Sequence, residues 1–316
     1  EENQNILKRF TLFLFFAFTV AIIDGYHQYF IGENIFGLIS DSPNRMTLLL
    51  NDNMILGGYL SRLFPFLFAL IILNYSSNRN YIYLIFGFLI LIDCLTFLSG
   101  ERTALGLLVI ATLLILFLTN KFKLLRVLSL IASLLIIIYI ANSNVGVKQR
   151  TIGFTITQMN LNENLEDIKY LSDDHESLSL IAYEMYKDLP IFGFGPKQFR
   201  IHCADYLNDD ERKFCTTHPH NSYLQLASET GTIGVFYILI PFCILIWFMI
   251  RQFYYLHINK KAIFSDYQVC LIITIFLSLW PIFPTLNFFN NWINVIYYLP
   301  VGFYLHYIHT GANKYK

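Results

Sequence analysis

Residues 202–240, which read HCADYLNDDERKFCTTHPHNSYLQLASETGTIGVFYILI, decide the fold. The stretch begins as a polar segment that holds Cys203, Cys215 and three histidines, and it continues past Gly231 into the apolar run at residues 235–240. Glycine at such a place is typical of the end of a short helix. A polar segment that leads straight into an apolar run indicates a water-exposed loop joined to a membrane span. We expect this segment to carry the chemistry of the protein.

The composition of the whole chain is that of a membrane protein. Of its 316 residues, 55% are hydrophobic and only 14% are charged, whereas soluble domains carry about 25% charged residues. The apolar residues fall in blocks near the ~20 residues that a helix needs to cross a bilayer. We therefore predict an all-α fold, a polytopic transmembrane helix bundle with about eight visible spans. The formal net charge of zero offers no case for nucleic-acid binding.

The apolar blocks divide the chain into three parts. Residues 1–141 hold the first five spans with an outside loop at residues 24–54, residues 142–231 form one large outside loop with short helices, and residues 232–316 hold the last three spans and a tail. The expected spans are residues 10–23, 55–73, 81–98, 103–119, 127–141, 232–250, 266–283 and 292–308.

Basic residues in the short loops predict the orientation. The short loops of one side carry Lys8, Arg9, Arg79, Lys121, Lys123, Arg126, Arg251, Lys260, Lys261, Lys314 and Lys316. The short loops of the other side carry Arg45, Arg62 and Arg102. Because basic loops stay on the cytoplasmic side, we expect both termini in the cytoplasm and the large loop outside.

Cys203 and Cys215 both lie in the large outside loop. An oxidising compartment favours a disulfide between them, and two free thiols are the alternative. The same cysteines could be drawn with His218 and His220 as a zinc site. Because the chain has no CxxC pair there, we predict no metal.

Two helix starts are expected inside the large loop. Asp173 and Glu176 have the spacing of a capping box, and their helix must end before Pro190. The apolar face of that helix is Leu178, Ile181, Ala182 and Met185. The second start follows a Gly-Pro pair, where free backbone N–H groups together with Lys197 and Arg200 would make an anion site. A plain turn is the alternative, and the residues favour neither.

His218 and His220 lie directly before a short helix expected at residues 222–230. A histidine in a loop is most often a solvated polar group. A neutral imidazole with a pKa near ~6.5 also suits a base that takes a proton from a substrate hydroxyl. Their place at the membrane-facing end of a loop tied by cysteines favours the base.

Arg102 lies at the mouth of the span at residues 103–119, where a charge is costly unless it pairs or binds a ligand. It either pairs with Glu101 or reaches the interface, or it holds a phosphate of a lipid-linked substrate. Arg62 has the same two interpretations, with the structural one ahead. Arg150 shares the outside location and is a candidate for a second phosphate contact.

Three motifs occur in an order, spacing and membrane placement that together are specific. They are Ser99-Gly100-Glu101-Arg102-Thr103-Ala104-Leu105, Pro190-Ile191-Phe192-Gly193-Phe194-Gly195, and His220-Asn221-Ser222-Tyr223-Leu224-Gln225 followed by Glu229-Thr230-Gly231 and Gly234. They resemble the Gly/Ser-x-Arg-Thr-Ala turn, the Pro-Leu-x-Gly-x-Gly segment and the His-Asn-x-x-Leu…Glu-x-Gly-x-x-Gly signature of the O-antigen ligase and O-antigen polymerase superfamily, which are bacterial membrane glycosyltransferases. Asp24-Gly25-Tyr26-His27-Gln28 with Gly32 is similar to an outside loop of many members.

The resemblance implies a metal-independent, inverting glycosyltransferase without a cofactor, in the lipid of the bacterial inner membrane with its active face in the periplasm. Its donor would be a polyprenyl-diphosphate-linked glycan. Its acceptor would be the lipid A core for a ligase or another repeat unit for a polymerase. By resemblance, His220 is the base that activates the acceptor hydroxyl, and Arg102 holds the diphosphate. The substrate-binding residues that we expect are Arg150, Arg200, Lys197, His218, His175, Asn221 and Arg62.

This chain differs from the usual pattern of the family in two respects. Many members carry an arginine where this chain reads Asp173-Asp174-His175-Glu176, so His175 or Arg200 would replace it. The family usually has more spans than are visible here, and we expect the others to precede Glu1.

The rival function is that of a transporter of lipid-linked glycans, which should place charged residues inside spans. Only Asp93 lies well inside one, and this favours chemistry at the membrane surface.

Overall fold

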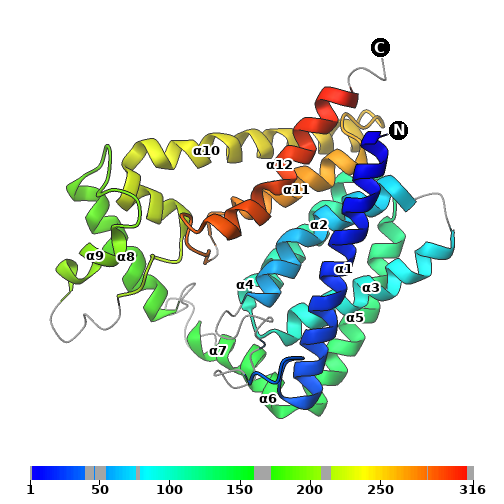
Figure 1. The fold of residues 1–316 in the computed structure, drawn as a ribbon, viewed down its shortest axis with the longest axis horizontal. Coiled ribbons are helices and arrows are strands. Elements are labelled where there is room, and N and C mark those ends of the chain that lie inside the picture. The colour runs from blue at the N-terminus through cyan, green and yellow to red at the C-terminus, as the bar shows by residue number, and fades with distance from the viewer. Residues whose placement is uncertain are drawn as a thin grey trace. The chain divides into compact units, whose positions relative to one another are not determined.

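The structure, a computed structural model, describes residues 2–39, 46, 55–75, 79–159, 172–207, 215–282 and 284–311. Within these residues the secondary structure is helical, apart from one isolated bridge between Glu33 and Ile39 (Figure 1). The predicted all-α class is confirmed.

The chain divides into two compact units. The bundle unit comprises residues 1–155, 249–277 and 300–316, and the loop unit comprises residues 156–248 and 278–299. The bundle unit contains α1 (Glu2–Ile31), α2 (Leu56–Tyr75), α3 (Arg79–Leu98), α4 (Arg102–Leu118), α5 (Lys123–Ser143), α6 (Val145–Lys148), the π-helical turn Gln149–Gly153 and nearly all of α11 (Asp266–Ser278). The loop unit contains α8 (Asp173–Asp188), α9 (Phe199–His202) and the 3₁₀ turn Cys203–Tyr206, while α7 (Phe154–Gln158), α10 (Ser222–His257) and α12 (Asn291–Gly311) have residues in both units.

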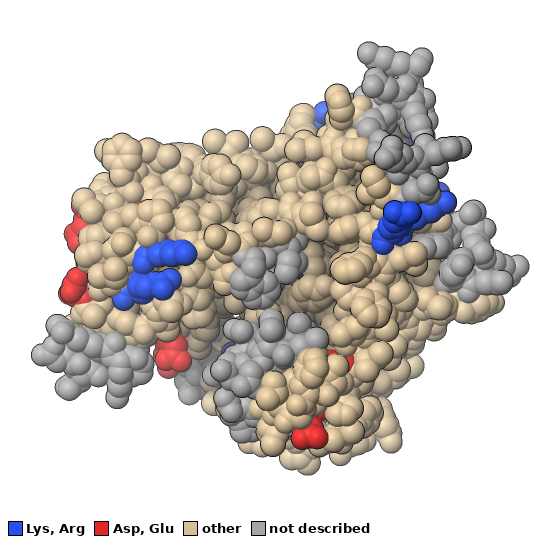
Figure 2. Space-filling view, in the orientation of Figure 1, with Lys and Arg blue, Asp and Glu red and all other residues tan. Residues whose placement is uncertain are grey.

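Four helices are long and apolar enough to cross a membrane, among the residues that the structure describes. They are residues Ile6–Ile31, Leu56–Asn74, Lys123–Ser143 and Ser222–His257. Three shorter apolar helices, Ile82–Leu98, Arg102–Leu118 and Asp266–Ser278, coincide with other predicted spans. The total of eight spans stays a prediction. Figure 2 shows a face on which the described residues are mostly uncharged, as lipid contact requires.

A buried ion pair joins three helices of the bundle unit. Arg126 on α5 donates from both terminal nitrogens to the Asp93 carboxylate on α3, at 2.7 and 2.9 Å, and it also donates to the Thr112 hydroxyl on α4. Ser133 on α5 donates to the same carboxylate at 2.9 Å. We predicted Arg126 in a basic loop, and this is wrong: its side chain is fully buried. The Asp93 carboxylate compensates the arginine charge and thereby permits its burial.

Helix α1 continues past the predicted span at residues 10–23. We expected an outside loop from residue 24, but the helix runs to Ile31. The Asp24 side chain is buried, and its Oδ1 accepts a hydrogen bond from the Ile35 N–H at 2.9 Å. A Cβ at Gly25 would lie 2.7 Å from Leu95 on α3, so the polar end of α1 packs on the bundle. Residues 40–45 and 47–54 of the expected loop lie outside the described residues.

The loop unit has a small hydrophobic core of its own. The predicted apolar face of α8 packs against Phe199 and Cys203, and the core residues are Leu178, Ile181, Ala182, Met185, Phe199 and Cys203. Burial of each large aliphatic side chain contributes roughly 1.5–3 kcal/mol. Helix α8 ends at Asp188, before Pro190 as predicted. Its N-cap residue is Ser172 rather than Asp173. The Ser172 hydroxyl makes no capping hydrogen bond to the backbone and instead bonds to His175 Nδ1 at 2.6 Å.

Gly231 divides α10 into a short first arm and a long second arm (Figure 1). Its φ of 65° and ψ of −162° are not helical and are accessible in practice only to glycine. The predicted short helix and the predicted span after it are therefore the two arms of one element. The first arm, residues 222–230, carries the polar residues that build the candidate site.

Candidate active site

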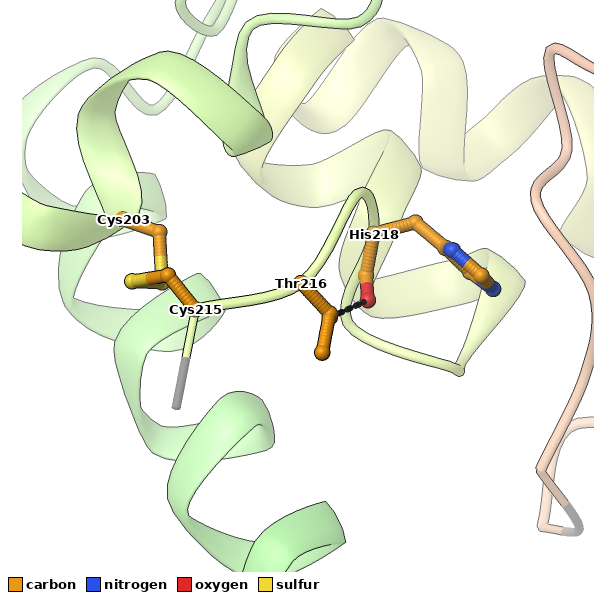
Figure 3. Close-up of a disulfide and its surroundings, with 4 residues drawn as sticks. All are labelled: Cys203, Cys215, Thr216 and His218. Carbon is orange, nitrogen blue, oxygen red and sulfur yellow. Dashed lines mark hydrogen bonds between the residues drawn. A yellow bond between two sulfur atoms is a disulfide. The ribbon is translucent and has the colours of Figure 1, made fainter. Parts of the chain in front are cut away.

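The predicted disulfide between Cys203 and Cys215 is present, with 5.9 Å between the two Cα atoms. Figure 3 shows the chain running from Cys215 through Thr216 to His218, whose ring points away from the sulfur atoms. The Thr216 hydroxyl donates to the His218 carbonyl at 2.7 Å. The disulfide therefore anchors the segment that delivers the histidines to the start of α10.

Three histidines from two elements of the loop unit lie together. The ring centroids of His218 and His220 are 4.1 Å apart, and those of His175 and His220 are 5.2 Å apart. His175 comes from the first turn of α8. The His218 ring is buried, with Nδ1 3.0 Å from the Thr217 hydroxyl and no hydrogen-bond partner at Nε2 among the described residues. We call His175, His218 and His220 the histidine cluster.

His220 has a backbone conformation that few non-glycine residues adopt. Its φ is 54°, in the left-handed region, where histidine is one of the better tolerated residues. Its carbonyl accepts a hydrogen bond from the Thr285 N–H at 2.6 Å. Local strain that the surroundings maintain is often found at active sites, because it fixes one side-chain direction.

Asn221 has a positioning role in this structure. Its side-chain oxygen accepts hydrogen bonds from the Tyr223 and Leu224 N–H groups, at 2.9 and 3.1 Å, and so it caps the first arm of α10. Its amide donates to the Pro281 carbonyl at 2.8 Å. These contacts use both ends of its side chain to fix the chain next to His220, and the expected binding of substrate by Asn221 stays a prediction.

The segment after α11 completes the site, and the sequence did not reveal it. Helix α11 ends at Ser278 rather than at residue 283 as we predicted. The chain next reads Trp280-Pro281-Ile282-Phe283-Pro284, and two prolines so close together disfavour a continued helix. The following residues, 279–282 and 284–290, form what we call the return segment. The prolines are the only sequence signal that could have placed it.

Side-chain hydrogen bonds attach the return segment to the first arm of α10. The Ser222 and Thr285 hydroxyls are 2.9 Å apart, and the Tyr223 hydroxyl donates to the Leu279 carbonyl at 2.9 Å. Gln225, which is fully buried, donates to the Asn287 side chain and accepts from the Phe288 N–H, both at 2.9 Å. The His-Asn-Ser-Tyr-Leu-Gln motif is therefore held by residues about 60 positions later in the chain.

The backbone groups of the predicted anion site are already occupied. The Lys197 and Phe199 N–H groups donate to the buried Glu229 carboxylate, at 3.0 and 2.8 Å. The Phe194 and Gly195 N–H groups donate to carbonyls at the end of the first arm of α10. The expectation of free N–H groups is therefore wrong, because Glu229 supplies the anion itself. The side chains of Lys197 and Arg200 are exposed.

Two members of the histidine cluster, His218 and His220, are neutral at pH 7. Burial lowers the pKa of His220 to about 4, and the neighbouring His218 and His175 lower it further. Burial also lowers the pKa of His218 to about 4; the Thr285 backbone opposes this, while Arg200 and His175 add to it. The ordinary pKa near ~6.5 that we assumed for a loop histidine does not apply, because these rings are removed from water.

Comparison with known proteins finds one family. Residues 85–239, just under half of the chain, match the family model described as O-antigen ligase. The match supports the O-antigen ligase superfamily for this part of the chain. No curated protein and no solved structure gives a significant match. The match covers α3 to the first part of the second arm of α10, so it includes the histidine cluster but not the return segment.

The family match and the apolar helices indicate a multi-pass membrane protein, and the matched family is glycosyltransferase-like. The family match implies, in general, a lipid-linked glycan and an acceptor as substrates. The arginines that we expected to contact a diphosphate have different surroundings in the structure. Arg102 is half-buried at the first turn of α4. Arg62 is 6% exposed inside α2, so it belongs to the predicted span at residues 55–73 and not to the short loops in which we also counted it. Arg150 lies in the π-helical turn, and its side chain is outside the described ones.

Glu101, beside Arg102, has a structural task. Its two carboxylate oxygens accept hydrogen bonds from the Gly57 and Gly58 N–H groups, at 2.7 and 3.0 Å, at the start of α2. A negative charge at this end of a helix is favourable. The Ser-Gly-Glu-Arg turn of the O-antigen ligase motif therefore fixes the start of α4 against the start of α2. Arg102 belongs to the bundle unit and His220 to the loop unit.

Proposed function

We propose that this protein is a glycosyltransferase of the O-antigen ligase type, which transfers a glycan from a polyprenyl-diphosphate carrier to an acceptor hydroxyl at the periplasmic face of the inner membrane. One observation carries the proposal. His220 of the family-matched segment is neutral, lies next to two further histidines, and is held in a left-handed conformation by Thr285. Its position is that of a pre-arranged base.

In the proposed reaction, the His220 imidazole takes the proton of the acceptor hydroxyl as that oxygen attacks the anomeric carbon of the donor. The new glycosidic C–O bond forms while the bond to the diphosphate breaks, with inversion at the anomeric carbon. The electron pair of the broken bond leaves on polyprenyl diphosphate, and the proton remains on His220 until water removes it. This displacement uses no metal and no cofactor.

The departing diphosphate gains negative charge, so cations fixed beside it lower the barrier. Arg102 is our first candidate for this contact, and Arg150 or Arg200 is the second. Arg200 is supported by its influence on the pKa of His218, which places its charge near the histidine cluster. Lys197 has an exposed side chain on the same turn. His218 and His175 would then border the acceptor, while the buried Arg62 would support the bundle.

The description of the matching family favours a ligase, whose acceptor is the lipid A core or a similar molecule. A polymerase of the same superfamily would use a repeat unit instead. Transport of lipid-linked glycans is less well supported, because the Asp93 carboxylate inside the bundle is fully engaged by Arg126, Ser133 and their neighbours. It is therefore not a group that lines a passage.

The test is glycan transfer by purified protein given a polyprenyl-diphosphate-linked oligosaccharide, with and without lipid A core. Released polyprenyl diphosphate and product size are followed for wild type, His220→Ala and the control His202→Ala, which removes a histidine of the same unit outside the cluster. We expect His220→Ala alone to lose at least 100-fold in rate, as for loss of a general base. A product that forms only with core identifies a ligase, and a ladder without core identifies a polymerase. Equal activity of His220→Ala and wild type would refute the base, and no turnover of donor by any variant would favour transport.

A further inference from the structure

The turn after α8 exposes three large apolar side chains. Leu189 is 46% exposed, Ile191 59% and Phe192 74%. These three residues are consecutive in the sequence except for Pro190, which is also exposed. Single exposed apolar residues are ordinary, but a contiguous group of this kind marks a surface that meets protein or lipid.

This turn is fixed at one level of α10. The Thr232 N–H and the Thr232 hydroxyl both donate to the Pro190 carbonyl at 2.8 Å. The same hydroxyl lies 2.9 Å from the Tyr186 hydroxyl of α8. A Cβ at Gly231 would be 2.2 Å from the Ile191 carbonyl oxygen, so only glycine permits this close approach. The Leu189–Phe192 turn therefore cannot move along α10 without breaking these contacts.

The level at which the turn is fixed is the expected boundary of the hydrocarbon layer. Residues 230–250 of α10 contain no Asp, Glu, Lys or Arg, between Glu229 and Arg251. As a helix this stretch is about 30 Å long, which is the thickness of the hydrocarbon core. The exposed apolar side chains of the second arm begin directly after Thr232, with Ile233, Phe236, Tyr237 and Ile240.

We propose that the Leu189–Phe192 turn is a membrane anchor, with Leu189, Ile191 and Phe192 inserted among the lipids at the outer boundary of the bilayer. The occupant of this surface is lipid and not another protein, because the turn is fixed to α10 at the depth where the exposed apolar side chains of that helix begin. The anchor gives the loop unit an attachment to the membrane surface in addition to its spans. It follows from the fold of a multi-pass membrane protein and does not depend on the proposed reaction.

The test places the photoreactive residue p-benzoylphenylalanine at single positions of the full chain, so that only one exposed side chain changes. Position 192 is compared with position 236, on the lipid-facing stripe of α10, and with position 176, in the acidic and exposed first turn of α8. Each protein is reconstituted into vesicles of phosphatidylethanolamine and phosphatidylglycerol, without donor, and irradiated. Mass spectrometry then measures phospholipid adducts on the peptide that carries the label.

We expect adducts at positions 192 and 236 that are at least fivefold more abundant than at position 176. Adducts at 236 but none above the level of 176 at position 192 would overturn the proposal, as would cross-links from 192 to polypeptide only. An intact Cys203–Cys215 disulfide in each labelled protein, measured by mass without reductant, shows that the loop unit has kept its fold. Because the vesicles contain no donor, a negative result here leaves the transferase assay unaffected, and loss of His220 activity leaves this assay unaffected.

Discussion

The rate of glycan transfer should be almost constant between pH 7 and pH 5, in contrast to enzymes whose base is an ordinary histidine. The reason is the burial of His220, which lowers its pKa to about 4. At pH 5 a base with a pKa of 4 is about 90% neutral, whereas one with a pKa of ~6.5 is only about 3% neutral. Relative to pH 7, the two cases predict about 90% and about 4% of the rate, a difference of roughly 20-fold.

The assay is the initial rate of polyprenyl diphosphate release at donor concentrations below KM, because kcat/KM reports the free enzyme. It is measured from pH 4.5 to 8 at constant ionic strength. A decline with a midpoint near pH 6.5 and a slope of one would refute the reasoning, since it would mean that the ring is hydrated. A flat profile that falls only below about pH 5 would support it.

Stability must be followed in the same experiment. The folded-state pKa values of His218 and His220 lie below the unfolded value, so the folded chain binds fewer protons. Above pH 6.5 both histidines are neutral in the folded and the unfolded chain, so the free energy of unfolding does not depend on their protonation. It falls as the pH drops from about 6.5 toward 4, because the unfolded chain then binds protons that the folded chain does not. Activity that returns when samples from pH 5 are brought back to pH 7 separates titration from unfolding.

Three further predictions concern stability. Arg126→Leu should lower the free energy of unfolding by about 3–5 kcal/mol, because it leaves the Asp93 carboxylate buried without its partner, and the double variant Asp93→Leu/Arg126→Leu should lower it much less. Melting temperatures in detergent measure both losses, and equal losses would contradict the pairing argument. Gly231→Ala should cost about 2–4 kcal/mol and release the turn after α8, because of the positive φ and the adjacent carbonyl; unchanged resistance of the loop to limited proteolysis would count against it. Replacing Cys203 and Cys215 by serine opens a link across 12 positions and should cost about 3 kcal/mol by the loop-entropy relation; a melting temperature equal to that of wild type would show that the link adds nothing.

Several features of the protein could be predicted from residues that are close in sequence. The length of an apolar block relative to a bilayer predicts a helix that is long enough to cross it, and α2, α5 and α10 are such helices. The repeat of apolar residues in α8 correctly predicted its buried face. Gly231 ends a helical arm because of its own backbone freedom. The Cys203–Cys215 pair was predicted from the location of both cysteines in the large outside loop, where an oxidising compartment favours a disulfide.

The tertiary structure decided which partner each polar group found. A pattern of residues does not say that Glu229 occupies the N–H groups of Lys197 and Phe199, 32 and 30 positions away, or that Asp93 lies beside Arg126. Nor does it place Thr285 on the carbonyl of His220.

The physical reason is that hydrogen bonds and pKa values depend on which segments approach each other and how much water they exclude. An apolar side chain, in contrast, is stabilised by any apolar environment and needs no specific partner. The sequence therefore determined the membrane helices, the disulfide and the identity of the histidine motif. The approach of the return segment and α8 to that motif determined that its histidines are neutral, close together and held in one conformation.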